Sequence, residues 1–246
     1  FCEDHENGGA LVLEYMPNGS LQDKLHPPVR SSSSNLPWRR RMSIALQLAE
    51  ALEYLHDKSD PHIVHGDIKA SNVLLDDNLN CKLCDFGSAK VGFSSHGSHV
   101  RKMVLMGSPG YTDPHYMRTG LATKKNDIYS YGVILLEMVT GMEAFSEEKN
   151  MPLTSILGPL IRSEAQVGSW LDDVVDHRLR KESVDLGQVR TILSLAALCL
   201  FQSPASRPSA AQISSTISDM SPSASFLSSP PNKDLTYFNH LNPIQF

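Results

Sequence analysis

A polar stretch in the first third of the chain carries side chains suited to phosphoryl transfer. The run VHGDIKASNVLL, residues 64–75, places Asp67, Lys69 and Asn72 between apolar residues. Asp85 follows 18 residues after Asp67, in the run CDFG. Phosphoryl transfer depends chiefly on positioning and on neutralising charge. A carboxylate, an ammonium group and further oxygen ligands on neighbouring loops are the groups that this reaction needs.

The residue types in this stretch indicate a division of roles. Asp67 can orient a substrate hydroxyl and accept its proton, and Lys69 can neutralise charge on the transferred group. Asn72 and Asp85 offer oxygen ligands of the kind that Mg²⁺ prefers, with phosphates and water completing the octahedron. Taken singly, each Asp or Asn could equally cap a turn, so the hypothesis depends on the whole set.

The elements before this stretch are predicted from apolar runs and turn residues. Residues 10–15, ALVLEY, form an apolar run that is typical of a buried strand. A Pro-Asn-Gly turn at residues 17–19 ends the run, and Ser20 is placed to cap a short helix over residues 21–26. Apolar residues three and four apart predict a long helix over residues 38–56 with one buried face.

The rest of the chain alternates between loops and helices. Residues 27–37 read as a polar loop, residues 62–90 as short strands with polar corners, and residues 91–112 as a long polar segment. Helical patterns resume at about residues 126–140, 153–161, 186–201 and 209–219.

Composition excludes several classes of protein. Of 246 residues, 41% are hydrophobic and 20% charged, which is typical of a globular chain rather than a disordered or fibrous one. The net charge of −5 gives no general attraction for nucleic acid. No apolar run approaches the roughly 18 residues that a membrane span needs. Four cysteines are too few for a disulfide scaffold, and we expect a reducing, cytoplasmic location.

The motifs, taken in order, resemble those of eukaryotic protein kinases. H-x-D-x-K-x-x-N followed by D-F-G is similar to the catalytic and metal-binding loops of that family. GSPGYTDPHY (107–116) resembles the end of an activation segment, and KKNDIYSYGVILLEMVTG (124–141) the central buried helix. SPASRPS (203–209) resembles a late segment that bears an arginine. One D-F-G is a weak signal, but these blocks in this order are specific.

Two further blocks resemble plant receptor-like kinases of the Pelle class. They are LVLEYMPNGSL and NLPWRRRMSIALQLAEALEYLH, and the whole resemblance covers roughly residues 10–219. It implies an α+β, protein-kinase-like fold with an essentially complete helical C-lobe and only the last strand or strands of the N-lobe. The implied organisation is an N-lobe remnant over 1–13, hinge and C-lobe over 14–219, and a disordered Ser/Pro-rich tail over 220–246.

The resemblance implies roles for individual residues. Asp67 matches the catalytic aspartate, and Lys69 with Asn72 matches the Ser/Thr-kinase form of the loop. Asn72 and Asp85 match the metal ligands for ATP-bound Mg²⁺, for which Mn²⁺ is a substitute. The backbone of the hinge, from Glu14 to Met16, matches the segment that meets adenine.

Other matches concern the support of the site. Ser108 falls where Ser/Thr kinases place a hydroxyl that contacts the catalytic Asp and Lys, and Asp127 matches a buried carboxylate that receives backbone donors from the catalytic loop. The residues assigned to structure or activation are His65, Phe86, Gly87, Ser108, His115, Asp127 and Arg207.

The chain departs from the family pattern in three ways. The Gly-rich loop, the lysine of the third strand and its glutamate partner have no counterpart, and we expect them upstream of Phe1. Gly66 stands where arginine is usual, which removes a charge that a phosphorylated loop would neutralise. His115 replaces the glutamate that normally pairs with a buried arginine, here Arg207, and we expect it to accept one bond from Arg207.

The function implied is transfer of the ATP γ-phosphoryl group to protein Ser/Thr hydroxyls, with the fragment itself inactive. The alternative is a pseudokinase or scaffold that acts by binding proteins. Expected partners are a protein substrate and a receptor complex, with no nucleic acid and no membrane span in this chain. Upstream sequence could place the protein at the inner face of the plasma membrane.

Overall fold

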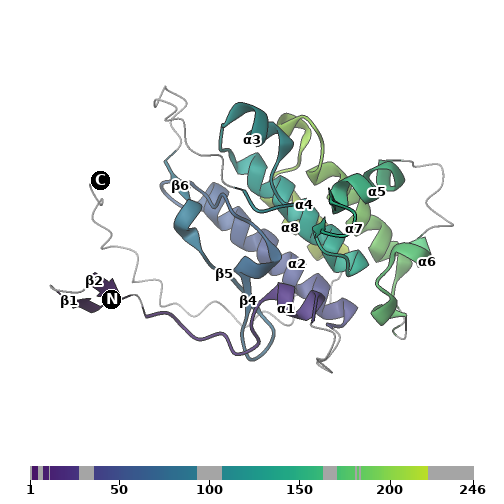
Figure 1. The fold of residues 1–246 in the computed structure, drawn as a ribbon, viewed down its shortest axis with the longest axis horizontal. Coiled ribbons are helices and arrows are strands. Elements are labelled where there is room, and N and C mark those ends of the chain that lie inside the picture. Colours follow the sequence, from purple (N-terminus) through teal and green to yellow (C-terminus); the bar gives the residue numbers. More distant parts are fainter. Residues whose placement is uncertain are drawn as a thin grey trace.

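The computed structural model describes residues 2–4, 8–10, 12–27, 36–92, 107–162, 171–180, 182 and 184–220 (Figure 1). The helices are α1 (Leu21–Leu25), α2 (Trp38–Glu53), α3 (Pro114–Thr119), α4 (Lys124–Thr140), α5 (Leu153–Arg162), α6 (Leu171–Val174), α7 (Leu186–Cys199) and α8 (Ala210–Met220). The strands are β1 (Cys2–Asp4), β2 (Gly8–Ala10), β3 (Ile63–Val64), β4 (Val73–Leu75), β5 (Cys81–Leu83), β6 (Lys90–Val91), β7 (Phe145–Ser146) and β8 (Met151–Pro152).

Helix α4 forms the centre of the helical body. It packs against α7, and α2 packs against α8. Almost every side chain of α4 is buried, including the carboxylates of Asp127 and Glu137. A capping box between Thr123 and Asn126 begins the helix, and Gly141, with φ of 64°, ends it.

The strands form small antiparallel pairs rather than one sheet. The pairs are β1 with β2, β3 with β6, β4 with β5, and β7 with β8. In Figure 1 the pairs built from β3 to β6 lie at one end of the body, and α5 and α6 lie at the other. Their corners bring residues 65–72 and 84–89 together beside the segment 107–113, and the candidate site lies where these three loops meet.

The expected helices are present with small shifts at their ends. Ser20 accepts a hydrogen bond from the Asp23 amide and completes a capping box at the start of α1. The predicted helix over residues 38–56 ends as α2 at Glu53 and continues as a π-helical turn, Tyr54–Lys58. The mostly helical architecture expected from the sequence is therefore confirmed.

The predicted strand over residues 10–15 is wrong. Strand β2 ends at Ala10, and residues 12–16 have no regular secondary structure. Val12, Leu13 and Tyr15 are 79%, 72% and 83% exposed. A strand needs a neighbour to receive its backbone hydrogen bonds, and no strand in the described part of the chain pairs with residues 12–15.

Three expectations concern segments that are wholly or largely outside the described residues. They are the polar loop at 27–37, the long polar segment at 91–112, and the Ser/Pro-rich tail at 220–246, of which 28–35, 93–106 and 221–246 are not described. Among the described residues, no helix is both long and apolar enough to cross a membrane.

Candidate active site

A buried carboxylate on α4 holds the loop that precedes Asp67. The Asp127 side chain accepts hydrogen bonds from the backbone N–H of His65 at 2.8 Å and of Gly66 at 2.9 Å. The imidazole Nε2 of His56 lies 2.8 Å from the same carboxylate. The buried helix α4 thereby fixes the backbone that precedes Asp67.

The Asp67 side chain lies among three polar side chains, those of Lys69, Asn72 and Ser108. Lys69 Nζ donates to Asp67 Oδ2 at 2.6 Å, and Ser108 Oγ donates to Asp67 Oδ1 at 2.9 Å. Lys69 Nζ also lies 3.1 Å from Ser108 Oγ, so these three side chains form a closed triangle. The Asn72 amide donates to the Asp67 backbone carbonyl at 2.9 Å and to Oδ2 at 3.2 Å.

These contacts keep Asp67 ionised. Partial burial by itself would raise the pKa of the carboxyl. Hydrogen bonds from Lys69, Ser108 and Asn72 and the charge of Lys69 outweigh burial and hold the pKa below its usual value. The carboxylate can therefore accept a hydrogen bond from a hydroxyl at neutral pH, and movement of Lys69 away from it would increase its basicity.

Backbone contacts place Asp85 beside the same loop. The Cys84 N–H donates to the Asn72 carbonyl at 2.9 Å, and His65 Nε2 lies 3.0 Å from the Cys84 carbonyl. Asp85 itself is exposed and adopts a left-handed backbone, with φ of 62°. Its side chain accepts a hydrogen bond from the Gly87 N–H at 3.3 Å, which fixes the turn that follows.

Phe86 packs on the catalytic loop. Its ring meets the imidazole of His65 edge to face, with centroids 4.7 Å apart. Since His65 also holds Cys84, one histidine connects the loop before Asp67 to both sides of Asp85.

The residues present fit a magnesium ion bound together with phosphates. Both amide hydrogens of Asn72 are directed at Asp67, which leaves the amide oxygen for a cation. The exposed carboxylate of Asp85 can supply a second oxygen. Among the described residues there is no group of three or more His, Cys, Asp or Glu side chains that could hold a metal ion. A hard cation here would accordingly take its other ligands from phosphate and water.

Gly66 has a backbone that other residues rarely adopt. Its φ is +81°, and a Cβ atom built on it would lie 2.8 Å from the carbonyl oxygen of Ser88. Glycine therefore lets the catalytic loop approach the backbone just after the DFG turn. A side chain at position 66 would force the loop backbone and the Ser88 carbonyl apart.

The prediction that His115 accepts a hydrogen bond from Arg207 is wrong. Arg207 instead forms a bidentate ion pair with Asp113, with Nη1 2.5 Å from Oδ2 and Nη2 2.9 Å from Oδ1. Both side chains are fully buried. A carboxylate accepts two hydrogen bonds from a guanidinium, whereas imidazole accepts one. The acidic partner of Arg207 is therefore Asp113, which precedes His115 by two residues.

Asp113 also organises the segment around it. It accepts a hydrogen bond from the His115 N–H and so caps α3, and it accepts another from the Asn126 amide at 2.7 Å. The aspartate thus joins α3, the start of α4 and Arg207 at one point.

Besides Asp113, the residues Tyr111 and Glu137 were assigned no role from the sequence. The Tyr111 hydroxyl donates to Glu137 Oε2 at 2.6 Å and lies 3.4 Å from the Ala70 N–H, which can donate to it. Tyr111 lies in the block 107–116 and Glu137 in the block 124–141, and both blocks resemble the kinase family. Nothing in the spacing of the two residues predicts that they would be hydrogen-bonded to each other.

The hinge residues lie apart from this cluster. Met16 is buried, whereas the exposed Glu14 side chain pairs with Lys82 on β5. Among the described contacts, none joins Glu14 or Met16 to Asp67.

Comparison with known proteins gives a consistent result. The family model described as the protein kinase domain matches residues 1–216. A probable receptor-like protein kinase of Arabidopsis thaliana is 50% identical over 242 residues, covering 92% of this chain and 69% of the relative.

Two rice proteins are also similar. Salt tolerance receptor-like cytoplasmic kinase 1 of Oryza sativa subsp. japonica is 50% identical over 87% of this chain and 58% of its own length. The LRR receptor-like serine/threonine-protein kinase SIK1 of the same species is 39% identical over 93% of this chain and 22% of its own length.

Proposed function

Because the chain belongs to the protein kinase family, and to its plant receptor-like serine/threonine branch, we propose that it carries the catalytic loop of an active kinase. The reaction is transfer of the γ-phosphoryl group of ATP to Ser or Thr hydroxyls of a protein substrate. The observation that carries this proposal is the closed triangle of Asp67, Lys69 and Ser108, with Asn72 completing the set.

Each side chain has a distinct role in this proposal. Asp67 Oδ accepts a hydrogen bond from the substrate hydroxyl, orients it for in-line attack and takes its proton as the new P–O bond forms. Lys69 turns from Asp67 towards the γ-phosphoryl oxygens and neutralises their charge, and the bond to the β-phosphate oxygen breaks. Ser108 keeps Asp67 in place while Lys69 is engaged.

The nucleotide and metal are those of the family, since protein kinases generally use ATP and Mg²⁺. Asn72 and Asp85 would hold the ion, with Mn²⁺ as a substitute, and the ion would neutralise phosphate charge. The hinge backbone from Glu14 to Met16 would meet adenine. His65, Phe86, Gly87, Asp127 and Arg207 support these groups through the contacts described above.

The division of the chain is part of this proposal. Residues 1–13 belong to the N-lobe side, residues 14–219 form hinge and C-lobe, and 220–246 form a tail. ATP in this family is held between two lobes, and the chain spans 69%, 58% and 22% of the three relatives. We expect the 246-residue chain by itself to transfer no phosphate, because its described residues before the hinge form only the strand pair of β1 with β2 to position ATP.

A scaffold without catalysis is the second candidate. Gly66 favours it, since the usual arginine beside the catalytic aspartate is absent. The presence of His115 in place of glutamate does not favour it, because Asp113 supplies the carboxylate for Arg207. The names of the relatives, which include "receptor-like cytoplasmic kinase", support two extensions of the proposal. The partner would be a receptor complex, and the location would be cytoplasmic, at the inner face of the plasma membrane.

Radiolabelled ATP tests the proposal. The full-length gene product that contains this chain is incubated with γ-labelled ATP, Mg²⁺ and a generic basic protein, and the labelled amino acids are separated after hydrolysis. We expect label on phosphoserine and phosphothreonine, and none when EDTA removes the metal. Binding of ATP and Mg²⁺ without any incorporation would establish the scaffold instead.

A further inference from the structure

We propose that His26, at the C-terminal end of α1, is a positioning residue for the segment 107–113, which borders Asp67 and so would face the protein substrate. It acts through Glu137 and Tyr111. This inference rests on the proposed kinase function. It is carried by an unbroken line of hydrogen bonds that connects a short surface helix to the catalytic loop.

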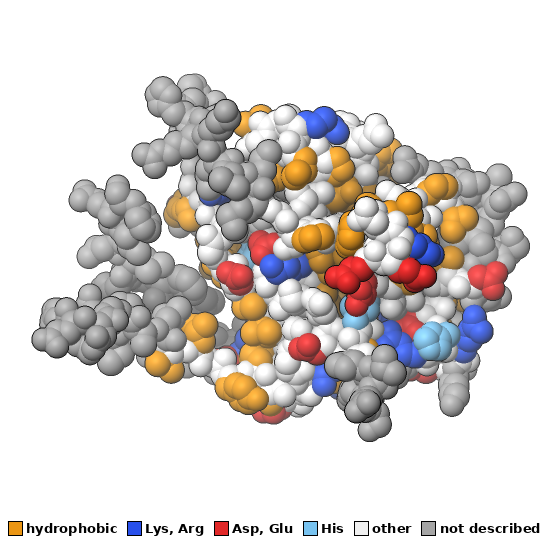
Figure 2. All heavy atoms as spheres, in the orientation of Figure 1, with side chains coloured by type: hydrophobic (Ala, Val, Ile, Leu, Met, Phe, Trp, Pro, Cys, Tyr) orange, Lys and Arg blue, Asp and Glu red, His pale blue; other side chains and the backbone are white. Residues whose placement is uncertain are grey.

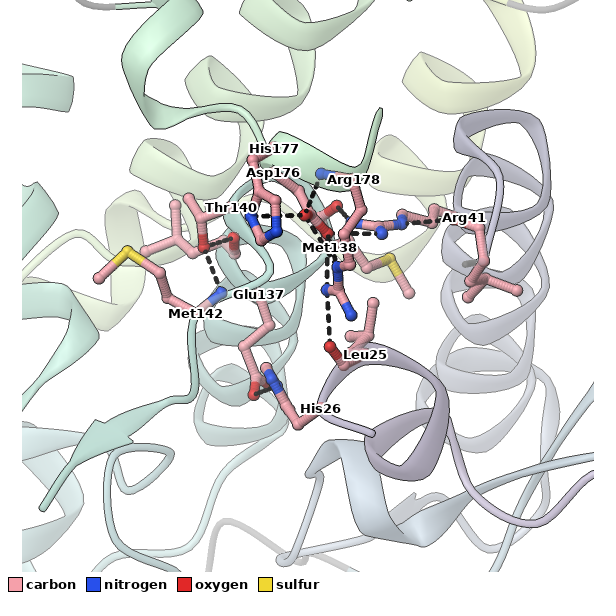
Figure 3. A network of polar contacts seen from close by, with 12 residues as sticks. Leu25, His26, Arg41, Glu137, Met138, Thr140, Met142, Asp176, His177 and Arg178 are labelled. Carbon is pink, nitrogen blue, oxygen red and sulfur yellow. Dashed lines mark hydrogen bonds and ion pairs between the residues drawn. The ribbon is translucent and has the colours of Figure 1, made fainter. Parts of the chain in front are cut away.

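The first contact joins α1 to α4. His26 Nε2 lies 3.0 Å from Glu137 Oε1, and Figure 3 shows the imidazole directed at this carboxylate. The two side chains are 8% and 1% exposed. A carboxylate at this depth is costly unless donors surround it. Three donors do so here: the imidazole, the Tyr111 hydroxyl and the Ala144 N–H at 3.2 Å.

The next contacts reach the reacting groups. Tyr111 donates to Glu137 Oε2 at 2.6 Å and can accept from the Ala70 N–H at 3.4 Å. Ala70 directly follows Lys69 in the catalytic loop. The Tyr111 N–H donates to the Ser108 carbonyl at 3.1 Å, and Ser108 contacts Asp67. The orientation of Glu137 therefore bears on both the catalytic loop and the segment that faces the substrate.

The imidazole is needed to hold that orientation. Oε1 of Glu137 has two described donors, His26 at 3.0 Å and the longer contact from Ala144. Without the imidazole, Oε1 is left with only the weaker contact in a buried site. The carboxylate can then rotate towards the missing donor, and the Tyr111 hydroxyl moves with it.

Helix α1 does not depend on His26 for its own position. The capping box of Ser20 and Asp23 holds its start, and Arg178 Nη2 donates to the Leu25 carbonyl at 2.7 Å near its end. Leu21 and Leu25 are buried in the core. Loss of the imidazole should accordingly disturb Glu137 and Tyr111 more than it disturbs the helix.

Two replacements of His26 distinguish the effect of losing its N–H donor from the effect of changing the volume of its side chain. His26→Leu fills the space without a donor, and His26→Gln restores an N–H donor of similar reach. Gln22→Leu, on the exposed side of the same helix, is the matched control. In the full-length gene product, we expect His26→Leu to raise KM for the protein substrate between about threefold and tenfold, the range for loss of one hydrogen bond. KM for ATP should stay unchanged, and His26→Gln should recover most of the loss.

Amide hydrogen exchange on the full-length gene product tests the coupling without an activity assay. We expect His26→Leu to speed exchange of the Ala70 and Tyr111 amides, His26→Gln to restore their protection, and Gln22→Leu to leave it unchanged. Absence of phosphoryl transfer by the wild type would refute the kinase proposal but leave this measurement decisive. Unchanged exchange at Ala70 and Tyr111 in His26→Leu, or no restoration by Gln, would overturn the role of His26.

Discussion

At the scale of single residues, the packing of Gly66 against Ser88 distinguishes this catalytic loop. The position carries no guanidinium for a loop phosphate to pair with. It also carries no Cβ, and the loop uses that freedom to approach the carbonyl of Ser88. Gly66 thus has two effects. It removes the charge of the usual arginine, and it allows the close approach to Ser88 on which the local geometry depends.

Gly120 provides a matched control for Gly66. Its φ is +68°, but a Cβ there would meet no atom within 4 Å. Gly120→Ala should cost only the strain of the left-handed backbone, about 1–2 kcal/mol. Gly66→Ala should cost more, because the Ser88 contact must also open, and it should lower phosphoryl transfer. Urea unfolding of both variants checks this, and equal losses of stability would contradict the role given to the Ser88 contact.

Sequence spacing predicted part of the site well. The positions of Asp67, Lys69 and Asn72 in one polar loop followed from their spacing, and family resemblance brought Ser108 and Asp127 next to them. Asp113 was missed because the family pattern directs attention to His115, and an aspartate two residues earlier looks like an ordinary helix cap. Only the fold shows that its carboxylate also reaches Arg207, 94 residues away.

At the scale of elements, the Asp113 and Arg207 pair anchors α3 to the body of the protein. Asp113→Asn should lower the free energy of unfolding by about 3–5 kcal/mol, because it leaves a guanidinium buried without its partner. His115→Ala is the neighbouring control and should cost well under half as much, since the described contacts of His115 are made by its backbone. Equilibrium unfolding in urea measures both, and a larger loss for His115→Ala would restore the original expectation.

A second buried carboxylate connects α2 with the segment after α6. Asp176 contacts Arg41 Nη2 at 2.7 Å and Arg178 Nη2 at 2.6 Å (Figure 3). Burial alone would raise its pKa, but hydrogen bonds from Arg178 and Arg41 lower it from the ordinary 3.8 to about 2. The folded state binds this proton less readily than the unfolded state. The stabilisation is therefore complete above about pH 4 and is lost as the pH falls towards 2.

Comparison of the wild type with Asp176→Asn tests this pH dependence. The variant should be less stable at pH 6, because the buried Arg41 loses its ion pair with the Asp176 carboxylate. The difference in unfolding free energy between the two proteins should shrink by about 2 kcal/mol between pH 5 and pH 2. A difference that stays constant over this range would show that Asp176 has an ordinary pKa.

Helices and strands differed in how far the sequence could predict them. Helix α4 follows from a long apolar pattern with a capping box, which are local features. The apolar run at residues 10–15 has the composition of a strand but has no strand beside it in the described part of the chain. Strand formation depends on a partner that is distant in sequence, and composition alone does not supply one.

At the scale of the whole molecule, three large hydrophobic side chains near the hinge are strongly exposed. Figure 2 shows hydrophobic side chains along the segment that runs from the N-terminal strands to α1. Val12, Leu13 and Tyr15 each present more than two thirds of their surface to solvent. Exposed apolar side chains that lie this close together along the chain favour association.

The 246-residue chain alone should consequently bind a hydrophobic dye and self-associate. Replacing Val12, Leu13 and Tyr15 together by Ser should reduce both, whereas Phe201→Ser, a single replacement at a 48% exposed position after α7, should have much less effect. Dye fluorescence and light scattering measure the effect. A monodisperse wild-type chain with no dye binding would contradict the prediction.

The central claim is that Asp67 takes part in phosphoryl transfer, and one comparison of rates tests it most directly. Asp67→Asn and the exposed control Asp77→Asn are made in the full-length gene product, and initial rates with labelled ATP are compared with the wild type. Loss of general base catalysis should slow Asp67→Asn by about a hundredfold or more, while Asp77→Asn keeps the wild-type rate. Wild-type rates for Asp67→Asn, in a protein that transfers phosphate, would contradict the account.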